Sequence, residues 1–348
     1  DLCECETDML AVGHFSDSNR LGKALRELDS KLEGAIGQLI ALGDFRGKPG
    51  TTAVVYSKGQ IGAKRVLLVG FGEKKSSNLN TRRRAAACAA KKAVTMRVRK
   101  LSLALHNTSG GRFDSVTAGR VMTEGIYFGS YLYDEYVTGD ENGRPAKLDV
   151  ELIDSDTART KKLKKGLSSG DVIGRAQSYS RTLANRPANV INPEALAKAA
   201  KALAKNSKNL TCRVLDEKQL EANGMGGILA VGSGSSSPPR LIVLHYSPRG
   251  KSTGARPAVA LVGKAITFDS GGISIKPSAK MEEMKLDKSG GIAVLGAVKS
   301  AAELNLPVEV YGIIPSAENL PSGTSYRPGD IVTTFSGKTV EVQNTDAE

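Results

Sequence analysis

Histidine and cysteine are both scarce in this sequence of 348 residues. Its three histidines, at positions 14, 106 and 245, stand far apart and outside any H-E-x-x-H pattern, which argues against a histidine-built zinc site. A Ser-His-Asp triad is arithmetically possible, but no G-x-S-x-G motif accompanies it. The four cysteines form no C-x-x-C pair, which argues against a zinc ribbon or a thioredoxin-type centre and suits a reducing compartment. Any metal chemistry must therefore depend on carboxylates.

Long apolar runs are also lacking. No run approaches the roughly 18 residues of a transmembrane helix, and the acidic start of the chain does not resemble a signal peptide. We therefore expect no membrane association and a cytoplasmic location, or an organelle if a transit peptide was removed. The first residue is Asp1 rather than Met, so we expect the natural N-terminus to lie upstream. With 40% apolar and 24% charged residues, the composition predicts a folded protein of two domains.

The positive charge is concentrated in one segment. Residues 51–100 hold 13 Lys and Arg against the single acid Glu73, a net charge of +12 within a chain total of +13. Such a segment suits an anionic partner such as nucleic acid, and it is also typical of a solvated helix face on a basic protein. Composition alone leaves both interpretations open.

Apolar patterning predicts an α/β protein. In the first part we expect strands at 65–71, 101–105 and 148–153, with helices at 78–100 and 115–135 between them. The basic stretch 154–166 reads as a solvated linker or the beginning of a helix, and the domain boundary is placed there. In the second part we expect helices at 167–184, 193–205 and 289–304, and strands at 210–215, 240–246, 257–263 and 307–314. The glycine- and serine-rich stretch 232–239 is predicted to be a flexible loop able to cradle an anion.

The residues that carry chemistry lie between positions 262 and 348. Lys264 ends an apolar strand, and Asp269 follows within the glycine-rich stretch DSGG. Lys276 comes next, Asp287 precedes a predicted helix, and the chain closes on NTDAE with Asp346 and Glu348. Polar groups on glycine-rich turns beyond strand ends are where α/β proteins place their sites. Converging carboxylates repel one another and call for cations such as Mg²⁺, Mn²⁺ or Zn²⁺. From spacing alone, ordinary surface acids and turns are an equally valid interpretation.

A family resemblance narrows these alternatives. The stretches VGKAITFDSGGISIKPS, MEEMKLD, PSAENLPSGTSYRPGD and NTDAE, in this order, strongly resemble the cytosolic leucine aminopeptidases, a family of two-metal exopeptidases. The resemblance covers residues 180–348 strongly and the first 160 residues weakly. It implies a small N-terminal α/β domain at 1–158, a linker or helix at 159–178, and an α/β catalytic domain at 179–348. That catalytic domain would hold a central mixed sheet flanked by helices, with its C-terminal part missing.

The same resemblance implies a role for each motif residue. Asp269 and Glu348 would bridge two divalent cations, Zn²⁺ or Mn²⁺ with Mg²⁺ as a further option. Lys264, in its neutral form, and Asp287 would complete one metal site, and Asp346 the other. Lys276 would stay charged and polarise the scissile carbonyl, a hydroxide between the metals would attack it, and Met284 would line the pocket for a leucine-like side chain.

The resemblance also implies binding partners, and two features of this sequence depart from the family pattern. Peptides would be the substrates, and a homo-oligomer, a hexamer in the family, would be the assembly. The alternative hypothesis is a DNA-binding or scaffold member that uses residues 51–100 and is inactive as a peptidase because the chain is truncated. Lys288, where many relatives have Met, either points away from the metals or shifts their affinity. Relatives continue beyond NTDAE, so we expect this chain to be truncated there.

Overall fold

A computed structural model describes residues 1–18, 20–104, 113–139, 147–154, 156–249 and 256–348. His106 and the last residue of the strand expected at 101–105 lie outside these ranges. The chain divides into two compact units, residues 1–178 and 179–348, and each is described by itself. None of the helices in the described ranges combines the length and apolar character that crossing a membrane requires.

The first unit contains a five-stranded sheet in the order β2-β3-β1-β4-β5. Strands β1, β3, β4 and β5 run parallel, and β2 pairs with β3 in the antiparallel direction. The elements are β1 (Met9–His14), α1 (Lys23–Lys31), α2 (Ala35–Ala41), β2 (Thr52–Tyr56), β3 (Arg65–Gly70), η1 (Lys74–Ser76), α3 (Leu79–Thr95), β4 (Lys100–Ala104), α4 (Ser115–Ser130), β5 (Asp149–Leu152) and α5 (Thr157–Asn185), which ends in the second unit.

Two apolar layers cover this first sheet. On one face, Leu25, Leu28 and Ile36 of α1 and α2 pack with Leu10 and Val12 of β1. On the other face, the alanines of α3 and the side chains of α4 pack with Met9, Ala11, Leu101 and Leu103. Successive side chains of a strand point to opposite faces, so β1 supplies both layers from adjacent positions. The near-continuous apolar run of β1 is typical of a strand buried on both sides.

The second unit is built on a mixed sheet in the order β6-β7-β10-β8, with β9 also paired to β10. Strand β7 is antiparallel to both of its neighbours, β6 and β10, whereas β8 and β9 both run parallel to β10. The remaining elements are α6 (Pro193–Lys205), β6 (Leu210–Leu215), α7 (Glu217–Ala222), α8 (Gly226–Gly232), β7 (Arg240–Tyr246), β8 (Ala258–Val262), β9 (Ala265–Asp269), η3 (Met281–Leu286), α9 (Ser289–Leu304), β10 (Glu309–Asn319), β11 (Ile331–Thr333) and β12 (Thr339–Glu341).

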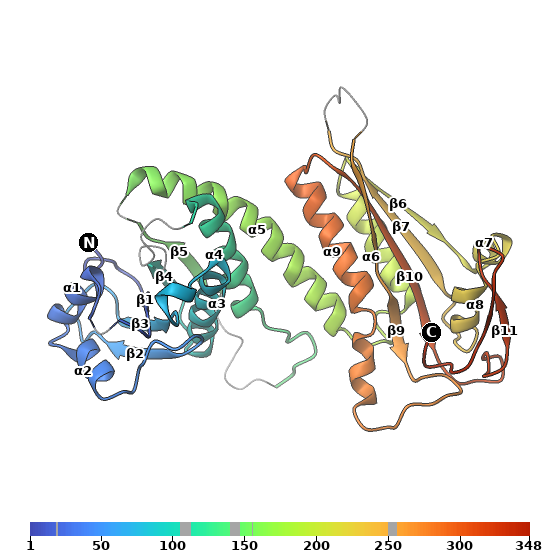
Figure 1. Cartoon of the computed structure of the whole chain (residues 1–348), viewed down its shortest axis with the longest axis horizontal. Helices are drawn as coiled ribbons and strands as arrows, with labels where there is room; N and C mark the ends of the chain where they lie inside the picture. The colour runs from blue at the N-terminus through green and yellow to red at the C-terminus, as the bar shows by residue number, and fades with distance from the viewer. Residues whose placement is uncertain (19, 105–112, 140–146, 155, 250–255) are drawn as a thin grey trace. The chain divides into compact units, whose positions relative to one another are not determined.

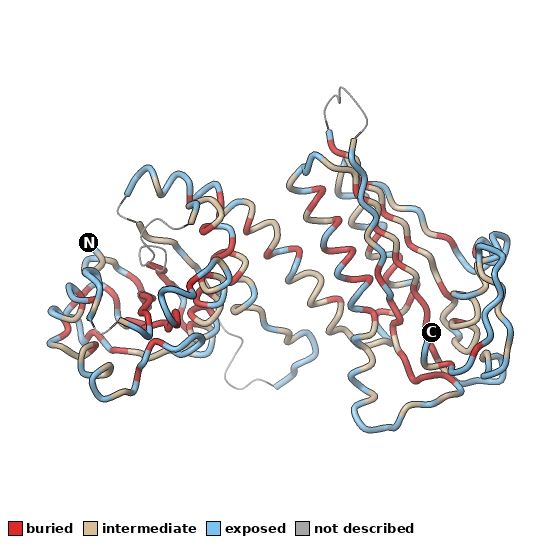
Figure 2. The backbone as a smooth tube through the Cα atoms, in the orientation of Figure 1, coloured by how far each residue is buried: buried red, intermediate tan, exposed pale blue. Residues whose placement is uncertain are grey.

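Helices α6 and α9 build the core of the second unit with the sheet. Leu196 and Ala200 of α6 and Leu295 and Val298 of α9 pack with the buried side chains of β7 and β10. Figure 2 shows this buried band along α9 and β10. The α/β class and the mixed sheet flanked by helices, expected from the sequence, are confirmed by this architecture.

Several expected boundaries differ from the structure. Residues 157–166, expected to be a linker or the start of a helix, are the first turns of α5, because the Asp156 carboxylate accepts hydrogen bonds from the Ala158 and Arg159 N–H groups. Helix α3 ends at Thr95, before Arg97 adopts a positive φ of 55°. The strand expected at 307–314 continues as β10 to Asn319, which brings its end to the site described next.

The stretch 232–239, expected to be a flexible loop for an anion, is held by protein contacts. Its Gly232 ends α8, and the Ser235 hydroxyl donates a hydrogen bond of 2.6 Å to Glu318. The Ser233 hydroxyl accepts from the Tyr326 N–H at 3.2 Å. These hydroxyls are therefore engaged by neighbouring residues of the second unit, so the stretch is tied to the fold, and anion binding by its backbone N–H groups stays a prediction.

Candidate metal centre

The sequence-predicted site residues gather at one edge of the second sheet. Strands β8, β9 and β10 are parallel, so their carboxyl ends lie at the same edge. Lys264 lies just beyond β8, and Asp269 is the last residue of β9. The carboxyl edge of parallel strands is the usual location of a site in an α/β domain.

A glycine turn connects this edge to the end of the chain. Gly271 and Gly272 both have positive φ, 87° and 69°, and a Cβ on Gly272 would lie 2.6 Å from the Asn319 Oδ1 atom. Glycine is required in such a conformation and at such a close approach. The fully buried Thr345 hydroxyl donates to the Gly271 carbonyl at 2.6 Å and accepts from the Ser274 N–H at 2.8 Å. The turn thus fixes the residues on both sides of Thr345, including Asp346.

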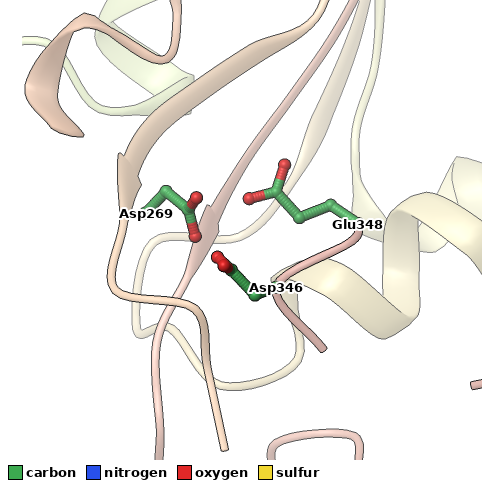
Figure 3. A group of neighbouring side chains, drawn as sticks. All are labelled: Asp269, Asp346 and Glu348. Atoms are coloured by element: carbon green, nitrogen blue, oxygen red, sulfur yellow. The ribbon is translucent and has the colours of Figure 1, made fainter. Parts of the chain in front are cut away.

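Three carboxylates converge as a result. Asp269, Asp346 and Glu348 each offer an oxygen, and these oxygens all lie within 4.8 Å of one another. Figure 3 shows the three side chains pointing into one shared space, Asp269 from the end of β9 and the other two from the last residues of the chain. The Asp269 side chain is 4% exposed and that of Glu348 is 3% exposed. Buried like charges at this separation repel strongly unless cations or protons compensate them.

Two lysines supply part of that compensation. The Lys264 Nζ atom lies 2.9 Å from Asp287 Oδ2 and also forms an ion pair with Glu348. The Lys276 Nζ atom lies 2.9 Å from Asp269 Oδ2 and also pairs with Asp346. The structure therefore brings together six of the seven predicted site residues in one connected set of charged contacts.

The charges shift the ionisation of the cluster. Burial and the neighbouring Asp269 raise the pKa of Glu348 to about 7, against the opposing effect of Lys264. Burial also acts to raise the pKa of Asp269, but hydrogen bonds from Glu348, Lys276 and the Gly271 N–H outweigh it, so the pKa is lowered. A proton therefore resides more readily on Glu348 than on Asp269, which marks the cluster as short of positive charge.

Both lysines are held in the charged form by this arrangement. Burial acts to lower the pKa of Lys264, but the carboxylates of Glu348 and Asp287 reverse the effect and raise it. Burial is likewise outweighed at Lys276, where Asp346 and Asp269 raise the pKa well above its usual value. A neutral, metal-binding Lys264 therefore requires cations that outweigh its two carboxylate partners.

The segment that follows both lysines, from η3 to the start of α9, carries Met284, Asp287 and Lys288. Asp287 directly follows η3 and precedes α9, and the half-buried Met284 lies within η3. Lys288 is fully buried, and its ammonium donates hydrogen bonds to the carbonyls of Arg186, at 3.0 Å, and of Lys285. Burial lowers the pKa of Lys288 to about 8. Its side chain therefore bonds to backbone carbonyls, and no ion pair links it to a carboxylate within the described ranges.

Sequence reasoning assigned no role to Asn319 and Thr345. The fully buried Asn319 amide donates to Asp269 Oδ1 at 3.0 Å and to the Thr345 carbonyl at 2.9 Å. Tyr326 donates to the same carbonyl at 2.6 Å. These residues stand inside the motifs ENLPSG, SYRPGD and NTDAE, but polar residues beside glycines are common in turns. Only the fold shows that they hold together the segments that carry Asp269 and Asp346.

The chemistry of this donor set fits divalent cations. Carboxylate oxygens from three residues face one space, Asp287 lies beside Lys264, and the excess negative charge is confined to a largely buried position. Hard cations such as Mg²⁺ and Mn²⁺ take oxygen ligands, and Zn²⁺ accepts carboxylates as well. Within the described ranges this is the one group of three or more such side chains close enough to share an ion.

Comparisons with known proteins agree across the whole chain. Residues 178–348 match the cytosol aminopeptidase family, catalytic domain, and residues 11–139 match the N-terminal domain of that family. A probable cytosol aminopeptidase of Syntrophotalea carbinolica is 42% identical over 344 residues, covering 99% of this chain and 68% of the relative. The cytosol aminopeptidase of Pseudomonas aeruginosa is 40% identical over 342 residues, with coverages of 98% and 68%.

Solved structures show the same relationship. A tomato leucine aminopeptidase mutant matches with a TM-score of 0.86 and 29% identity, covering 99% of this chain and 66% of that one. The bottromycin maturation enzyme BotP, in complex with Mn, matches with a TM-score of 0.79 and 31% identity, covering 98% and 66%. This chain thus spans about two thirds of the length of the proteins it matches.

Proposed function

This chain belongs to the cytosol aminopeptidase family, and from that premise we propose that it is a metal-dependent aminopeptidase that releases apolar, leucine-like residues from the N-termini of peptides. The observation that carries the proposal is the convergence of Asp269, Asp346 and Glu348 within 4.8 Å at the carboxyl edge of the second sheet. A solved relative described in complex with Mn supports a divalent metal at this place. The names of the curated relatives support a cytoplasmic location.

The ligands divide between two cations in this proposal. Asp269 and Glu348, the most buried carboxylates, stand between the two lysines and are suited to bridge both ions. Asp287 and a neutral Lys264 complete one site, and Asp346 completes the other. When bound, two such cations polarise a carbonyl group and lower the pKa of water enough to make it a nucleophile at neutral pH.

Lys276 is suited to stabilise the charge that develops on the substrate. Its ammonium is held beside Asp269 and Asp346, and its raised pKa keeps it protonated throughout the physiological pH range. A group that stays protonated cannot act as the general base, but it can donate a hydrogen bond to the oxygen of the tetrahedral intermediate. The carboxylates position this ammonium before the substrate arrives, so little reorganisation is needed during the reaction.

Substrate selection follows from charge and from the surrounding side chains. In this proposal one of the two cations would bind the free α-amino group of a peptide N-terminus, which would select for an exopeptidase rather than an endopeptidase. Met284, half-buried in η3 close to Asp287, offers a flexible thioether to an apolar side chain. Assembly into a homohexamer is part of the same proposal and is supported by family membership alone.

The test combines metal stoichiometry with peptide hydrolysis. Native mass spectrometry of the 348-residue chain in Mn²⁺ or Zn²⁺ buffer is expected to give two ions per chain, and leucine p-nitroanilide is expected to be hydrolysed only with metal present. The variant Asp269→Asn should lose the ions and the activity together, while Asp330→Asn, a carboxylate paired with Arg327 on an exposed turn, should keep both. A chain that takes up no metal, or an Asp269→Asn variant with parental binding and turnover, would refute the proposal.

A further inference from the structure

A cavity of about 560 Å³ lies in the first unit, away in sequence from every ligand of the metal centre. Its wall includes residues 12–15 at the end of β1, Ala104 at the end of β4 and Ile153 just after β5. The first residues of α1 complete this side of it. Because β1, β4 and β5 are parallel neighbours, the cavity stands at their carboxyl ends.

At this position the strand order of the sheet reverses: β2 and β3 are added on one side of β1, and β4 and β5 are then added on the other side. The chain leaves β1 through α1 and α2 on one face, and β3 follows on one side of β1. It then crosses by α3 on the other face to β4, on the opposite side of β1, and the next helix after β4, α4, packs on that same face. Connections that leave two adjacent parallel strands toward opposite faces open a crevice between them, and open α/β sheets bind their ligands there.

The N-terminus of α1 supplies unoccupied hydrogen-bond donors to this cavity. Gly22, the N-cap residue, is extended, with φ −61° and ψ 163°, and has no side chain to cap the helix. The first backbone bond of the helix runs from the Arg26 N–H to the Gly22 carbonyl. Residues 23–25 line the cavity, and their N–H groups have no acceptor in the parts of the chain that the structure describes. An uncapped N-terminus of a nine-residue helix attracts an anion through these donors and the helix dipole.

A second, independent feature is the ring of His14. This side chain is only 5% exposed and borders the cavity, and its ring has no hydrogen-bond partner among the described residues. Its nearest aromatic neighbour, Phe45, lies 6.1 Å away between ring centroids. Burial lowers the pKa of His14, so the ring is neutral at pH 7 and offers one donor and one acceptor. The ring nitrogens are not among the fully enclosed polar atoms without a partner in the described residues, so they are open to the cavity and can donate to or accept from a molecule bound there.

The charged groups around the cavity are consistent with an anion. Lys23 and Lys74 both line it. Asp154 pairs with Arg159 at 2.9 Å, and Glu27 lies 3.9 Å from Lys23, so these charges offset one another, and Lys74 has no ion-pair partner among the described residues. The Asp1 carboxylate accepts a hydrogen bond from the Cys3 N–H at 2.9 Å.

We propose that this cavity binds a phosphorylated small molecule of about mononucleotide size, with its phosphate at the N-terminus of α1 and its organic part against His14 and the strand ends. The volume lies within the roughly 300–1,000 Å³ range of small-molecule sites. This site is separate from the proposed peptidase chemistry, and its occupation does not depend on metal.

The experiment is isothermal titration calorimetry of the full 348-residue chain with three probes. Adenosine 5′-monophosphate is expected to bind, inorganic phosphate to bind more weakly, and adenosine to give no measurable heat at the same concentration. Lys23→Pro removes one donor N–H and the charge, and the extended Gly22 accommodates a following proline at the first helical position. Its affinity should fall about two- to fivefold below that of Lys23→Ala, which removes the charge alone.

Two further variants complete the design. Lys31→Ala, at the opposite end of α1, should bind like the parent, and His14→Gln should weaken binding of the nucleotide while its thermal unfolding confirms folding. If His14→Gln unfolds, the comparison of Lys23→Pro with Lys23→Ala decides the matter alone. Absence of heat from the nucleotide, equal binding of adenosine, or equal affinities for Lys23→Pro and Lys23→Ala would each overturn the proposal. Leucine p-nitroanilide hydrolysis should be unchanged in every variant, which separates this result from any failure of the peptidase proposal.

Discussion

Replacing Asn319 with alanine tests how the parts of the metal centre are held together. The side chain is fully buried at the end of β10 and donates hydrogen bonds to Asp269 Oδ1, at 3.0 Å, and to the Thr345 carbonyl, at 2.9 Å. One bond orients the Asp269 carboxylate, which is a bridging ligand in the proposed centre, and the other holds the residue before Asp346. The change leaves every ligand in the chain, so any effect on metal binding must act through position.

The expected magnitude follows from these two bonds. Asn319→Ala removes one hydrogen bond to a charged acceptor and leaves a buried carbonyl with one partner fewer, which should cost about 2–4 kcal/mol of unfolding free energy. For a unit of 170 residues, counted from 179 to 348, this corresponds to a fall in Tm of about 5–15 °C. Loss of a residue that orients metal ligands commonly weakens metal binding by about 10- to 100-fold. Both the stability and the Mn²⁺ affinity should therefore fall.

Ser316→Ala is the matched control. Ser316 is equally buried on the same strand, and its hydroxyl has no hydrogen-bond partner among the described residues. Its removal should leave Mn²⁺ affinity, measured by calorimetric titration, within about twofold of the parent, because its hydroxyl makes no hydrogen bond to a candidate ligand residue, although its backbone pairs with Ala265 of β9. If Asn319→Ala binds Mn²⁺ with parental affinity and has the same Tm as Ser316→Ala, then Asn319 does not position the centre and the reasoning fails.

The remaining predictions concern the metals, the ammonium and the basic segment. Free Mn²⁺ at about 100 times its Kd should stabilise the second unit by about 2.7 kcal/mol, seen as a higher Tm by calorimetry; an equal rise in Asp269→Asn would contradict this. Lys276→Ala should lower kcat by about 10²–10³-fold with the metal retained, and Lys276→Arg should restore part of the lost kcat. The control Lys280→Gln, on the exposed turn that follows, should have the kcat of the parent. An unchanged kcat in Lys276→Ala would exclude a role of Lys276 in stabilising the tetrahedral intermediate. If the chain binds duplex DNA, neutralising the exposed Arg84 and Lys91 to Gln should reduce the slope of log K against log salt by about 0.9 per contact; parental binding would end that hypothesis.

The DNA-binding hypothesis illustrates what composition could not show. Arg82 belongs to the basic segment, yet it is 1% exposed and lies over the Phe71 ring, 4.4 Å from its centroid. Arg83 pairs with Glu124 at 2.7 Å. A count of charges treats all these side chains as equal, whereas packing removes some of them from the surface. Only the exposed members of the segment are therefore targets for the test.

Lys288 illustrates the same limit beside the metal centre. Its position after Asp287 left two outcomes open in the sequence, because a long flexible side chain can turn toward or away from a neighbouring carboxylate. The structure directs the ammonium to the carbonyls of Arg186 and Lys285. The Arg186 carbonyl is distant in sequence, so no local pattern could have identified it.

The sequence by itself determined the α/β class, the order of most helices and strands, and the side chains capable of holding divalent cations. These follow from local properties: apolar periodicity, glycine turns, and motifs whose members lie within a few residues of one another. Only the tertiary structure decided which of these groups meet. The parallel pairing of β8 and β9 with β10 brings Lys264 and Asp269 to one edge, and the hydrogen bonds of Asn319 and Thr345 bring the last residues of the chain to them. Such pairing depends on contacts between residues 26 to 74 positions apart, and local sequence patterns do not encode contacts at that separation.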